Sequence, residues 1–557
     1  MADAVKQLFP GVKLGIGPAI ENGFYYDFDK AEPFAPEDLD RIAQKMRGII
    51  EADLSFEKEM VPREKAIELF EKMGETYKAE LIKELPDKEV SIYRHGNFMD
   101  LCKGPHAAKT GEVKAFKLLS IAGAYWRGSE TNPMLQRIYG AAFLTQKELD
   151  DYIKLLEESK KRDHRKLGKE LEYFSFHNDM GAGLILYHPK GGLLRMLIED
   201  WEKKEHLRRG YQIVMGPHIM KSDIWVRSGH YEFYKDLMYI FQIEGQEYAV
   251  KPMNCPGHML IFQSKTRSYK DLPLRLFELG SVYRYEKSGV LHGLLRVRGF
   301  TQDDAHIFCL PEQLVDEITG VIDFIGDAMK MFGFAEFETE LSTRPPKSIG
   351  TDKAWKDSQD ALIAALEKRG LAYQVSEGEG AFYGPKIDIK LKDALGRLWQ
   401  CATIQCDFAL PERFDLTYVG QDGKEYRPVM LHRVILGSME RFIGTLLEHY
   451  AGALPLWLSP VQAAVIPITD KQNGYALSVK KTLEERDIRA ELYAQNNTLG
   501  YKIREAQTQK VPYMLIVGEK EAAAGVVAVR SRATKDEGQT KLSDFIDRAV
   551  REIKEKR

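Results

Sequence analysis

The chain has 557 residues, which is too long for a single hydrophobic core and predicts two to four domains. Apolar residues make up 44% and charged residues 29% of the composition, so collagen-like and largely disordered classes are excluded. The 80 basic and 83 acidic residues give a net charge of −3, so any nucleic-acid surface must be local.

Cysteine content and hydrophobic patterning indicate the cellular compartment of the protein. The five cysteines (Cys102, Cys255, Cys309, Cys401 and Cys406) do not form the dense framework of a secreted disulfide-rich domain, which favours a reducing environment. No apolar run reaches the ~18 residues of a membrane span, and the N-terminal residues lack a signal-peptide pattern. We therefore expect a cytoplasmic protein with no membrane partner.

The first two regions are short. Residues 1–144 combine β-type runs with one charged helix near Pro36–Leu54, which predicts a small α+β unit. In residues 145–168, Thr145-Gln-Lys-Glu148 matches a capping box and precedes apolar residues at helical spacing. This pattern predicts a linker helix.

The remaining chain divides into a large and a small region. In residues 169–456, strand-like runs alternate with amphipathic helices, which predicts a large sheet with helices packed on it. The main strand-like runs are Tyr211–Val214, Leu274–Arg284, Ile387–Leu391 and Trp399–Phe408. Residues 457–557 alternate strand and helix, as is typical of a compact α/β domain. From Leu458 onward, 18 basic and 14 acidic residues allow contact with RNA.

Three segments of the large region together supply what a nucleoside triphosphate needs. Gly210–Pro217 is an apolar strand that ends in proline. Arg284–Glu286 and Arg296–Phe300 hold arginines that can fork onto phosphate oxygens and a ring that can stack on a base. Gly437–Arg441 leads from small residues to another arginine. Each arginine alone is more often a solvated ion pair, but the joint arrangement favours a nucleotide site.

A second constellation is a candidate metal site. Cys255, His306 and His432 lie on three separate segments. One thiolate and two imidazoles suit Zn²⁺ with its fourth position left for substrate or water. Spacing alone leaves open the alternative of a buried thiol and two hydrogen-bonded histidines.

The order of the three segments resembles the signature motifs of class II aminoacyl-tRNA synthetases. The surrounding residues are similar to the threonyl-tRNA synthetases in particular, and the resemblance covers essentially the whole chain. The segments that carry it are Lys251-Pro-Met-Asn-Cys-Pro-Gly-His258, Arg298-Gly-Phe-Thr-Gln-Asp-Asp-Ala-His-Ile-Phe308 and Gly380-Ala-Phe-Tyr-Gly-Pro-Lys-Ile-Asp388. This resemblance implies an α+β multidomain protein with an antiparallel-sheet catalytic domain (169–456), a C-terminal α/β anticodon-binding domain (457–557) and an N-terminal α+β editing-like domain (1–144).

The implied activity is that of a threonine–tRNA ligase in which zinc selects the amino acid. One Zn²⁺ per chain, held by Cys255, His306 and His432, would accept the amino and hydroxyl groups of threonine. An apolar pocket separates threonine from the near-isosteric valine by only ~1–3 kcal/mol, whereas valine has no hydroxyl for a metal to bind. The resemblance assigns five further residues to the threonine pocket: Met253, Gln302, Asp304, Tyr383 and Gln405.

The same resemblance implies in-line attack of the threonine carboxylate on the α-phosphate of ATP, with Mg²⁺ bridging phosphates, and then transfer to the 3′ end of tRNA(Thr). The implied ATP-binding residues are Arg284, Glu286, Arg296, Phe300, Gln400 and Arg441. Three residues are assigned to catalysis: Arg284, Lys386 and Arg441. In this scheme Arg284 holds the α-phosphate and Phe300 stacks on adenine.

Two further sites follow from the resemblance. In the last region Asn496, Arg504, Glu521 and Arg530 match family positions that read anticodon bases. In the first region Cys102 and His106 match half of a site that hydrolyses seryl-tRNA, whose other half is a His-x-x-x-His segment. The chain begins inside that segment, and Asp3 is assigned to the place of its second histidine. We therefore expect an N-terminally short form with an incomplete editing-like domain and weak or lost editing.

Two alternative functions and a dimeric assembly are also considered. A catalytically inactive, synthetase-derived RNA-binding or regulatory protein is the main alternative, and the retained arginines and zinc ligands count against it. A zinc hydrolase is disfavoured because no His-Glu-x-x-His motif occurs. We expect a homodimer, because the first class II motif packs at the subunit interface and its strand otherwise leaves an exposed edge.

Overall fold

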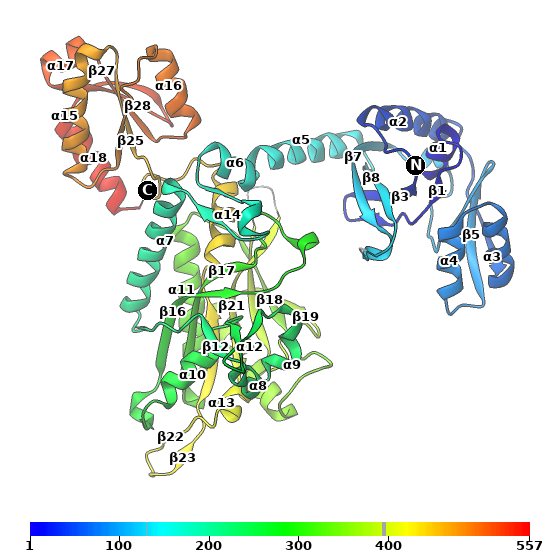
Figure 1. Ribbon diagram of the computed structural model, residues 1–557, viewed down its shortest axis with the longest axis horizontal. Coiled ribbons are helices and arrows are strands. Elements are labelled where there is room, and N and C mark those ends of the chain that lie inside the picture. The colour runs from blue at the N-terminus through cyan, green and yellow to red at the C-terminus, as the bar shows by residue number, and fades with distance from the viewer. Residues whose placement is uncertain (130, 393–396, 557) are drawn as a thin grey trace. The chain divides into compact units, whose positions relative to one another are not determined.

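The computed structural model describes residues 1–129, 131–392 and 397–556 (Figure 1). The chain forms two compact units, Met1–Glu158 and Ser159–Arg557. The boundary falls inside the predicted linker helix. Within the described residues, the helices are too short or too polar to cross a membrane.

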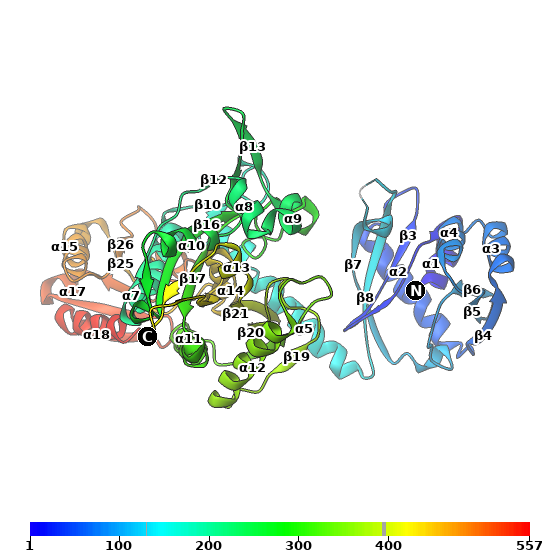
Figure 2. The same ribbon diagram turned by 90° about the horizontal axis from the view of Figure 1, so that it is seen from below.

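The first unit is built on two antiparallel sheets. The larger has the order β1-β3-β8-β7, with β2 beside β3, and the smaller has the order β4-β5-β6. Helices α3 and α4 pack beside the smaller sheet (Figure 2). The strands are β1 (Lys13–Leu14), β2 (Ala19–Ile20), β3 (Gly23–Asp29), β4 (Glu57–Pro62), β5 (Glu89–His95), β6 (Phe98–Leu101), β7 (Ala115–Tyr125) and β8 (Met134–Phe143), and the helices are α1 (Ala2–Leu8), α2 (Pro36–Glu51), α3 (Arg63–Lys72) and α4 (Thr76–Glu84).

The linker helix α5 (Gln146–Arg162) begins as its sequence predicts. The backbone N–H of Thr145 donates to the Glu148 carboxylate at 3.0 Å, and the N–H of Glu148 donates to the Thr145 hydroxyl at 3.2 Å. Two otherwise unpaired N–H groups are thereby satisfied. Helix α6 (His164–Glu170) follows, with Asp163 as its N-cap.

The second unit contains an eight-stranded sheet of order β11-β16-β17-β24-β21-β20-β18-β19. Its two outermost pairs are parallel and the inner pairs are antiparallel. The strands are β11 (Gln212–Ile213), β16 (Leu274–Tyr283), β17 (Gly299–Cys309), β18 (Phe337–Ser342), β19 (Gln374–Ser376), β20 (Lys386–Lys392), β21 (Leu398–Asp407) and β24 (Val429–Val434). The predicted strand at 211–214 shortens to two residues, because only these two pair with β16.

Helices cover one face of this sheet with an apolar core. Ala305 and Ile307 of β17 pack there with residues of four helices, namely α7 (Pro189–Arg208), α11 (Leu314–Met331), α12 (Asp352–Arg369) and α14 (Met439–His449). The smaller elements of this region are β9 (Phe174–Ser175), β10 (Leu186–Tyr187), β12 (Ile219–Lys221), α8 (Asp223–Ser228), α9 (His230–Tyr234), β13 (Ile240–Ile243), β14 (Gln246–Val250), α10 (Cys255–Gln263), β15 (Arg267–Ser268), α13 (Ala409–Arg413), β22 (Tyr418–Val419) and β23 (Glu425–Tyr426). On the opposite face, Phe308 of β17 and Met430 of β24 pack with residues of α10 in a smaller apolar core.

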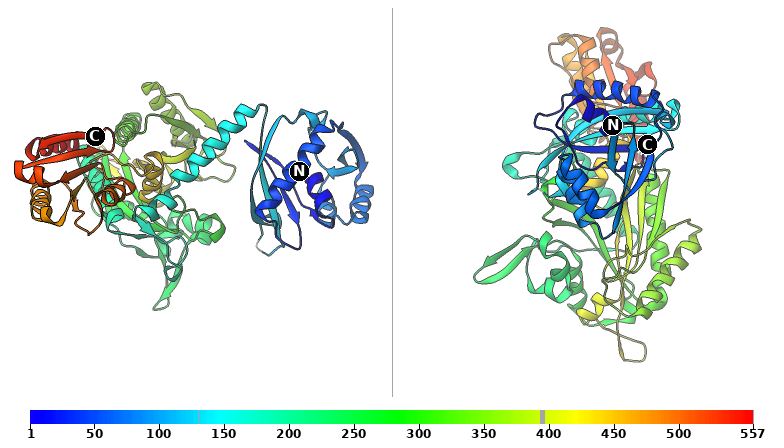
Figure 3. Two further views of the ribbon diagram at one scale, coloured as in Figure 1. Left: turned by 90° about the horizontal axis from the view of Figure 1, so that it is seen from above. Right: turned by 90° about the vertical axis from the view of Figure 1, so that its right-hand side faces the viewer.

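The last region is a five-stranded sheet of order β26-β25-β27-β28-β29 with helices on both faces (Figure 3). Its elements are β25 (Ala463–Pro467), α15 (Asn473–Glu484), β26 (Ala490–Leu492), α16 (Leu499–Thr508), β27 (Tyr513–Val517), α17 (Glu519–Ala524), β28 (Val526–Ser531), β29 (Lys535–Lys541) and α18 (Leu542–Lys554). The sequence pattern missed α17 and β29. The first is a single short helix, and the second is a polar edge strand without apolar alternation.

Candidate active site

Alternate residues of strand β17 form the centre of the site. Phe300, Gln302, Asp304 and His306 are spaced two apart, so their side chains share one face of the sheet. The residues between them face the helices, as the burial of Ala305 in the core indicates. One strand therefore carries predicted ATP, threonine and metal ligands in a single line.

Strand register extends the site across the sheet. His306 of β17 lies opposite His432 of β24, which lies opposite Gln405 of β21. Gln405 in turn lies opposite Lys386 of β20. Directly opposed residues in antiparallel strands point to the same face. A row of four predicted site residues thus crosses four strands.

The three predicted metal ligands meet at this row. The ligand atoms of Cys255, His306 and His432 all lie within 4.8 Å of one another. His306 Nε2 and His432 Nδ1 are 2.9 Å apart, which places two imidazole nitrogens face to face. Cys255 approaches from the first turn of α10. The structure therefore brings together three residues that are up to 177 positions apart, from Cys255 to His432.

Neighbouring side chains fix the two imidazole rings. His306 Nδ1 contacts His258 Nδ1 at 2.8 Å, and His432 Nε2 contacts the Asp407 carboxylate at 2.7 Å. Burial, with His258 and His432 nearby, lowers the pKa of His306, so its ring is neutral. A neutral ring with one nitrogen held by a partner is the form that ligates a metal.

The thiol completes a donor set that fits zinc. Burial raises the pKa of Cys255, and the carboxylates of Asp304 and Asp407 raise it further. A thiolate at this position therefore needs a cation beside it. One sulfur and two imidazole nitrogens are ligands that Zn²⁺ prefers, with a fourth position open.

The predicted threonine residues surround this donor set. Asn254 Nδ2 donates to the Asp304 carboxylate at 3.0 Å, and the Tyr383 ring lies 5.2 Å from the His432 ring, centroid to centroid. A Cβ on Gly384 would lie 1.8 Å from the carbonyl oxygen of Cys406, so only glycine lets the Tyr383 loop approach β21. Met253 packs against two apolar clusters, one that includes residues of α10 and one that includes Trp225 of α8.

A cavity of about 300 Å³ lies at the Phe300 and Gln302 end of the line on β17. Its lining includes all six predicted ATP residues and Gln302: Arg284, Glu286, Arg296, Phe300, Gln302, Gln400 and Arg441. The guanidinium carbon of Arg284 lies 5.2 Å from the centre of the Phe300 ring. Arg296 forms a 3.0 Å ion pair with Glu286.

The arginines give this cavity a positive potential. Burial lowers the pKa of Arg441, and Arg284 and Arg296 lower it further by charge repulsion. Arginine stays protonated in proteins, so this group of like charges favours an anion beside it. Arg441 Nε donates to the carbonyl of Leu295 at 3.2 Å and Nη1 to that of Gln400 at 3.3 Å.

Asp388 was not predicted as a site residue. It connects Lys386 with Gln400, one of the predicted ATP residues. Its carboxylate accepts from Lys386 Nζ at 2.6 Å and from Gln400 Nε2 at 2.8 Å. His230 was also missed; its Nε2 lies 4.0 Å from Cys255 Sγ, and its side chain is buried. Asp388 and His258 end two of the motif segments, which by themselves assign them no partner. His230 and Asp407 stand outside those segments, and only contacts with distant residues reveal them.

The predicted anticodon residues lie on separate elements of the last domain. Asn496 and Arg504 are exposed, in the loop before α16 and on α16 itself. Arg530 lies on β28, two residues after Ala528, on the face covered by α16. Glu521 accepts from the Gly518 N–H at 2.9 Å, so it caps the start of α17.

The predicted editing pair lies in the first unit. A hydrogen bond from His106 lowers the pKa of Cys102, against the effect of partial burial. The His106 ring packs on Tyr93 at 4.2 Å. A cavity of about 400 Å³ includes both residues together with Asp3 and His95.

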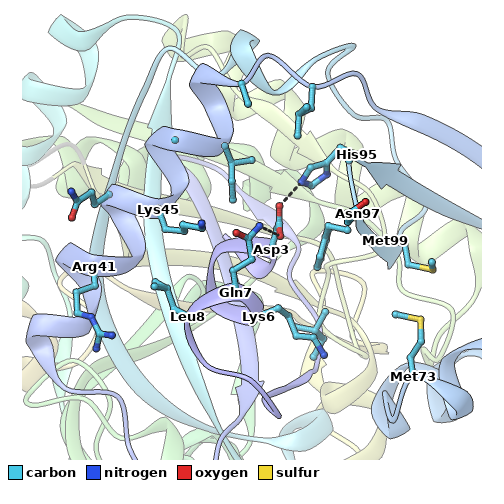
Figure 4. A pocket seen from close by; sticks show the side chains of 18 of the residues that line it. Asp3, Lys6, Gln7, Leu8, Arg41, Lys45, Met73, His95, Asn97 and Met99 are labelled. Atoms are coloured by element: carbon cyan, nitrogen blue, oxygen red, sulfur yellow. Dashed lines mark hydrogen bonds and ion pairs between the residues drawn. The ribbon is translucent and has the colours of Figure 1, made fainter.

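Asp3 and His95 separate this cavity from a larger one of about 1030 Å³, which both residues also line (Figure 4). The Asp3 carboxylate contacts His95 Nε2 at 3.0 Å and accepts from Gln7 at 2.7 Å. Burial raises the pKa of Asp3, but these hydrogen bonds outweigh it and the pKa is lowered overall. Asp3 is therefore an ionised carboxylate paired with His95.

Comparison with known families agrees with this geometry. Residues 239–450 match the tRNA synthetase class II core domain (G, H, P, S and T), residues 462–552 match an anticodon binding domain, and residues 90–139 match the second additional domain of threonyl and alanyl tRNA synthetases. These matches confirm the predicted fold class.

Individual relatives are similar over the whole chain. Threonine–tRNA ligase of Citrifermentans bemidjiense is 59% identical over 554 residues, which cover 100% of this chain and 87% of that protein. The enzyme of Pelobacter propionicus is 58% identical with the same coverage. A solved structure, the RNA binding domain of threonyl-tRNA synthetase from Cryptosporidium parvum Iowa II, has a TM-score of 0.68 and 43% identity and covers 70% of this chain and 98% of its own. The chain belongs to the threonine–tRNA ligases, a family of class II aminoacyl-tRNA synthetases.

Proposed function

We propose that the chain activates threonine with ATP on one face of β17. ATP would lie in the arginine-lined cavity, and the amino acid would lie beside Cys255, His306 and His432. ATP with Mg²⁺, threonine and tRNA are the substrates of this ligase family. The observation that carries the proposal is the line from Phe300 to His306, which joins the two sites on one sheet face. We also place the enzyme in the cytoplasm.

In the first step, the threonine carboxylate attacks the α-phosphate of ATP and pyrophosphate leaves. The reacting oxygens all carry negative charge, so alignment and cations supply the catalysis. We assign Arg284 to the α-phosphate, Arg296 and Arg441 to the γ-phosphate end, and Phe300 to the adenine. Lys386 is held by Asp388 at the edge of this site, from which its ammonium can reach the reacting carboxylate.

In the proposed selection step, Cys255, His306 and His432 hold one Zn²⁺. When bound, this ion supplies a Lewis-acid position for the amino and hydroxyl groups of threonine. Asp304 can accept the hydroxyl proton in a hydrogen bond, and Gln302, Tyr383, Gln405 and Met253 close the pocket. Valine leaves these polar groups unpaired, which is the costly kind of mismatch.

The catalytically inactive alternative is not favoured. A protein that only binds RNA has no physical need for three arginines that line one cavity, where Arg284 and Arg296 lower the pKa of Arg441 by charge repulsion. In the last domain, we assign Asn496, Arg504, Glu521 and Arg530 to anticodon bases, which a protein reads through edge hydrogen bonds and stacking.

The zinc assignment predicts the outcome of removing the thiol. Cys255→Ala should lower bound zinc from about one per chain to near zero and abolish threonine-dependent pyrophosphate exchange, because two imidazoles alone leave the site incomplete. Metal content is measured by mass spectrometry. Cys309→Ala, a change at another buried cysteine, should keep the zinc. A Cys255→Ala protein that retains metal and activity would refute the assignment.

The ATP assignment predicts a division of labour. Arg441→Ala should lower pyrophosphate exchange by at least about 10²-fold, the usual effect of losing one charge-stabilising donor. Binding of tRNA in a filter assay should change little, because its anticodon contacts lie elsewhere. Arg369→Ala, which removes an exposed arginine paired with Asp323, is the matched control. Equal losses of tRNA binding and activation by Arg441→Ala would contradict this division.

The edge of the large sheet supports a homodimer. Strand β11 pairs only with β16, among the described strands. Ile213, at its end, is 39% exposed, and Met215, two residues further on, is 87% exposed. We expect a dimer by light scattering at micromolar concentration, and Met215→Asp should weaken it. Met134→Asp, at a 62% exposed methionine of the first unit, should not. A fully active monomeric parent would exclude the dimer.

The editing assignment predicts imperfect fidelity. Serine has the amino and hydroxyl groups of threonine and lacks one methyl, a difference of only ~1–3 kcal/mol, so it should be activated. We expect slow clearance of preformed seryl-tRNA, because Asp3 and His95 are paired with each other beside Cys102 and His106. Rapid deacylation that disappears in Cys102→Ala but persists in Cys309→Ala would show a complete editing site.

A further inference from the structure

His164, at the start of α6, is completely buried and uses both ring nitrogens. Its Nδ1 lies 2.8 Å from the Glu448 carboxylate, and its Nε2 lies 3.0 Å from the backbone nitrogen of Leu294. A backbone N–H can only donate, so Nε2 accepts and Nδ1–H donates to Glu448. The two partners therefore fix a neutral ring in one tautomer.

The Leu294 side of this contact is a tight turn. His292 N donates to Arg296 O at 3.0 Å, and Arg296 N donates to His292 O at 3.2 Å, so the turn closes at Arg296. Gly293 has a φ of +49°, and a Cβ there would lie 2.1 Å from His164 Nε2. Only glycine lets the turn reach the histidine.

The turn leads directly into the arginine-lined cavity. Arg296 is its last residue, and the Leu295 carbonyl accepts the 3.2 Å hydrogen bond from Arg441 Nε. On the other side of the histidine, Glu448 belongs to α14, the same helix as Arg441. One imidazole thus joins the turn that carries Arg296 to the helix that carries Arg441.

A metal role for His164 does not fit these contacts. Asp163, His164 and Glu448 have ligand atoms within 4.8 Å of one another. Both ring nitrogens of His164 have protein partners, however, and the Asp163 carboxylate is bound by Arg165 at 2.6 Å. The group is a hydrogen-bonded cluster.

We propose that His164 is a positioning residue for ATP: it holds the 292–296 turn so that Arg296 and Arg441 face the phosphate site together. The proposal rests on the assignment of these arginines to ATP. Since α6 directly follows the linker helix α5, the segment that leaves the first unit also supports the ATP site.

Two variants of similar size separate the two hydrogen bonds. In His164→Gln, the amide oxygen can replace Nε2 and accept from Leu294, and the bond to Glu448 is lost. In His164→Asn, the amide nitrogen can replace Nδ1–H and donate to Glu448, and the bond to Leu294 is lost. Each variant loses one buried hydrogen bond, and its melting temperature measures the general destabilisation that results.

The readout is the KM for ATP in pyrophosphate exchange, with the KM for threonine, zinc content and melting temperature measured in parallel. His164→Asn should raise the KM for ATP by about tenfold or more, the effect of one lost buried hydrogen bond, and leave the KM for threonine unchanged. His164→Gln should stay within about twofold of the parent. Lys166→Ala, at an exposed position of α6, is the control.

The Arg296→Ala variant separates a failure of the ATP assignment from a failure of the positioning role of His164. If Arg296→Ala leaves the KM for ATP unchanged, the ATP assignment itself is wrong. If Arg296→Ala raises it but His164→Asn does not, or if Asn and Gln raise it equally, the positioning role of His164 is overturned. Similar melting temperatures for the Asn and Gln variants would show that a difference in KM comes from the turn.

Discussion

The two-residue period of strand β17 is the constraint on which the site depends. In a pleated strand, neighbouring side chains point to opposite faces, so every second residue from Phe300 to His306 lies on the face of the proposed substrate site. A shift of register by one residue would bury all of them in the apolar core. The antiparallel neighbours on both sides fix this register.

The residues of opposite phase secure the strand from behind. The Asp303 carboxylate accepts the backbone N–H groups of Ile435, Leu436 and Gly437 at 2.6, 2.8 and 2.9 Å. These donors form the connection from β24 to α14, the helix that carries Arg441. A single buried carboxylate therefore ties the strand of the site to the helix that supplies one of its arginines.

The charges of the site are complementary to its proposed ligands. Cys255 is buried near two carboxylates, an arrangement that disfavours a thiolate unless a cation is present. In the arginine-lined cavity, the half-buried Arg441 lies near two other arginines, which lower its pKa and favour a bound anion. Such opposed requirements suit the proposed metal ion and triphosphate.

The order of residues along the chain predicts the family, the fold class, the main strands and helices, and the residues that belong to motifs. Those residues belong to contiguous segments such as Arg298–Phe308, which can be recognised from the sequence alone. Tertiary structure decided the residues that hold them in place: His258, Asp407, Asp388 and His164. The partners of His258, Asp407 and His164 lie far away in sequence, and a hydrogen bond across two strands or between a helix and a distant turn leaves no periodic signature in either segment. Asp388 bonds to Lys386 on its own strand, but its bond to Gln400 depends on the pairing of β20 with β21. The polar edge strand β29 escaped prediction for a related reason, since its pairing with β28, and not its own composition, makes it a strand.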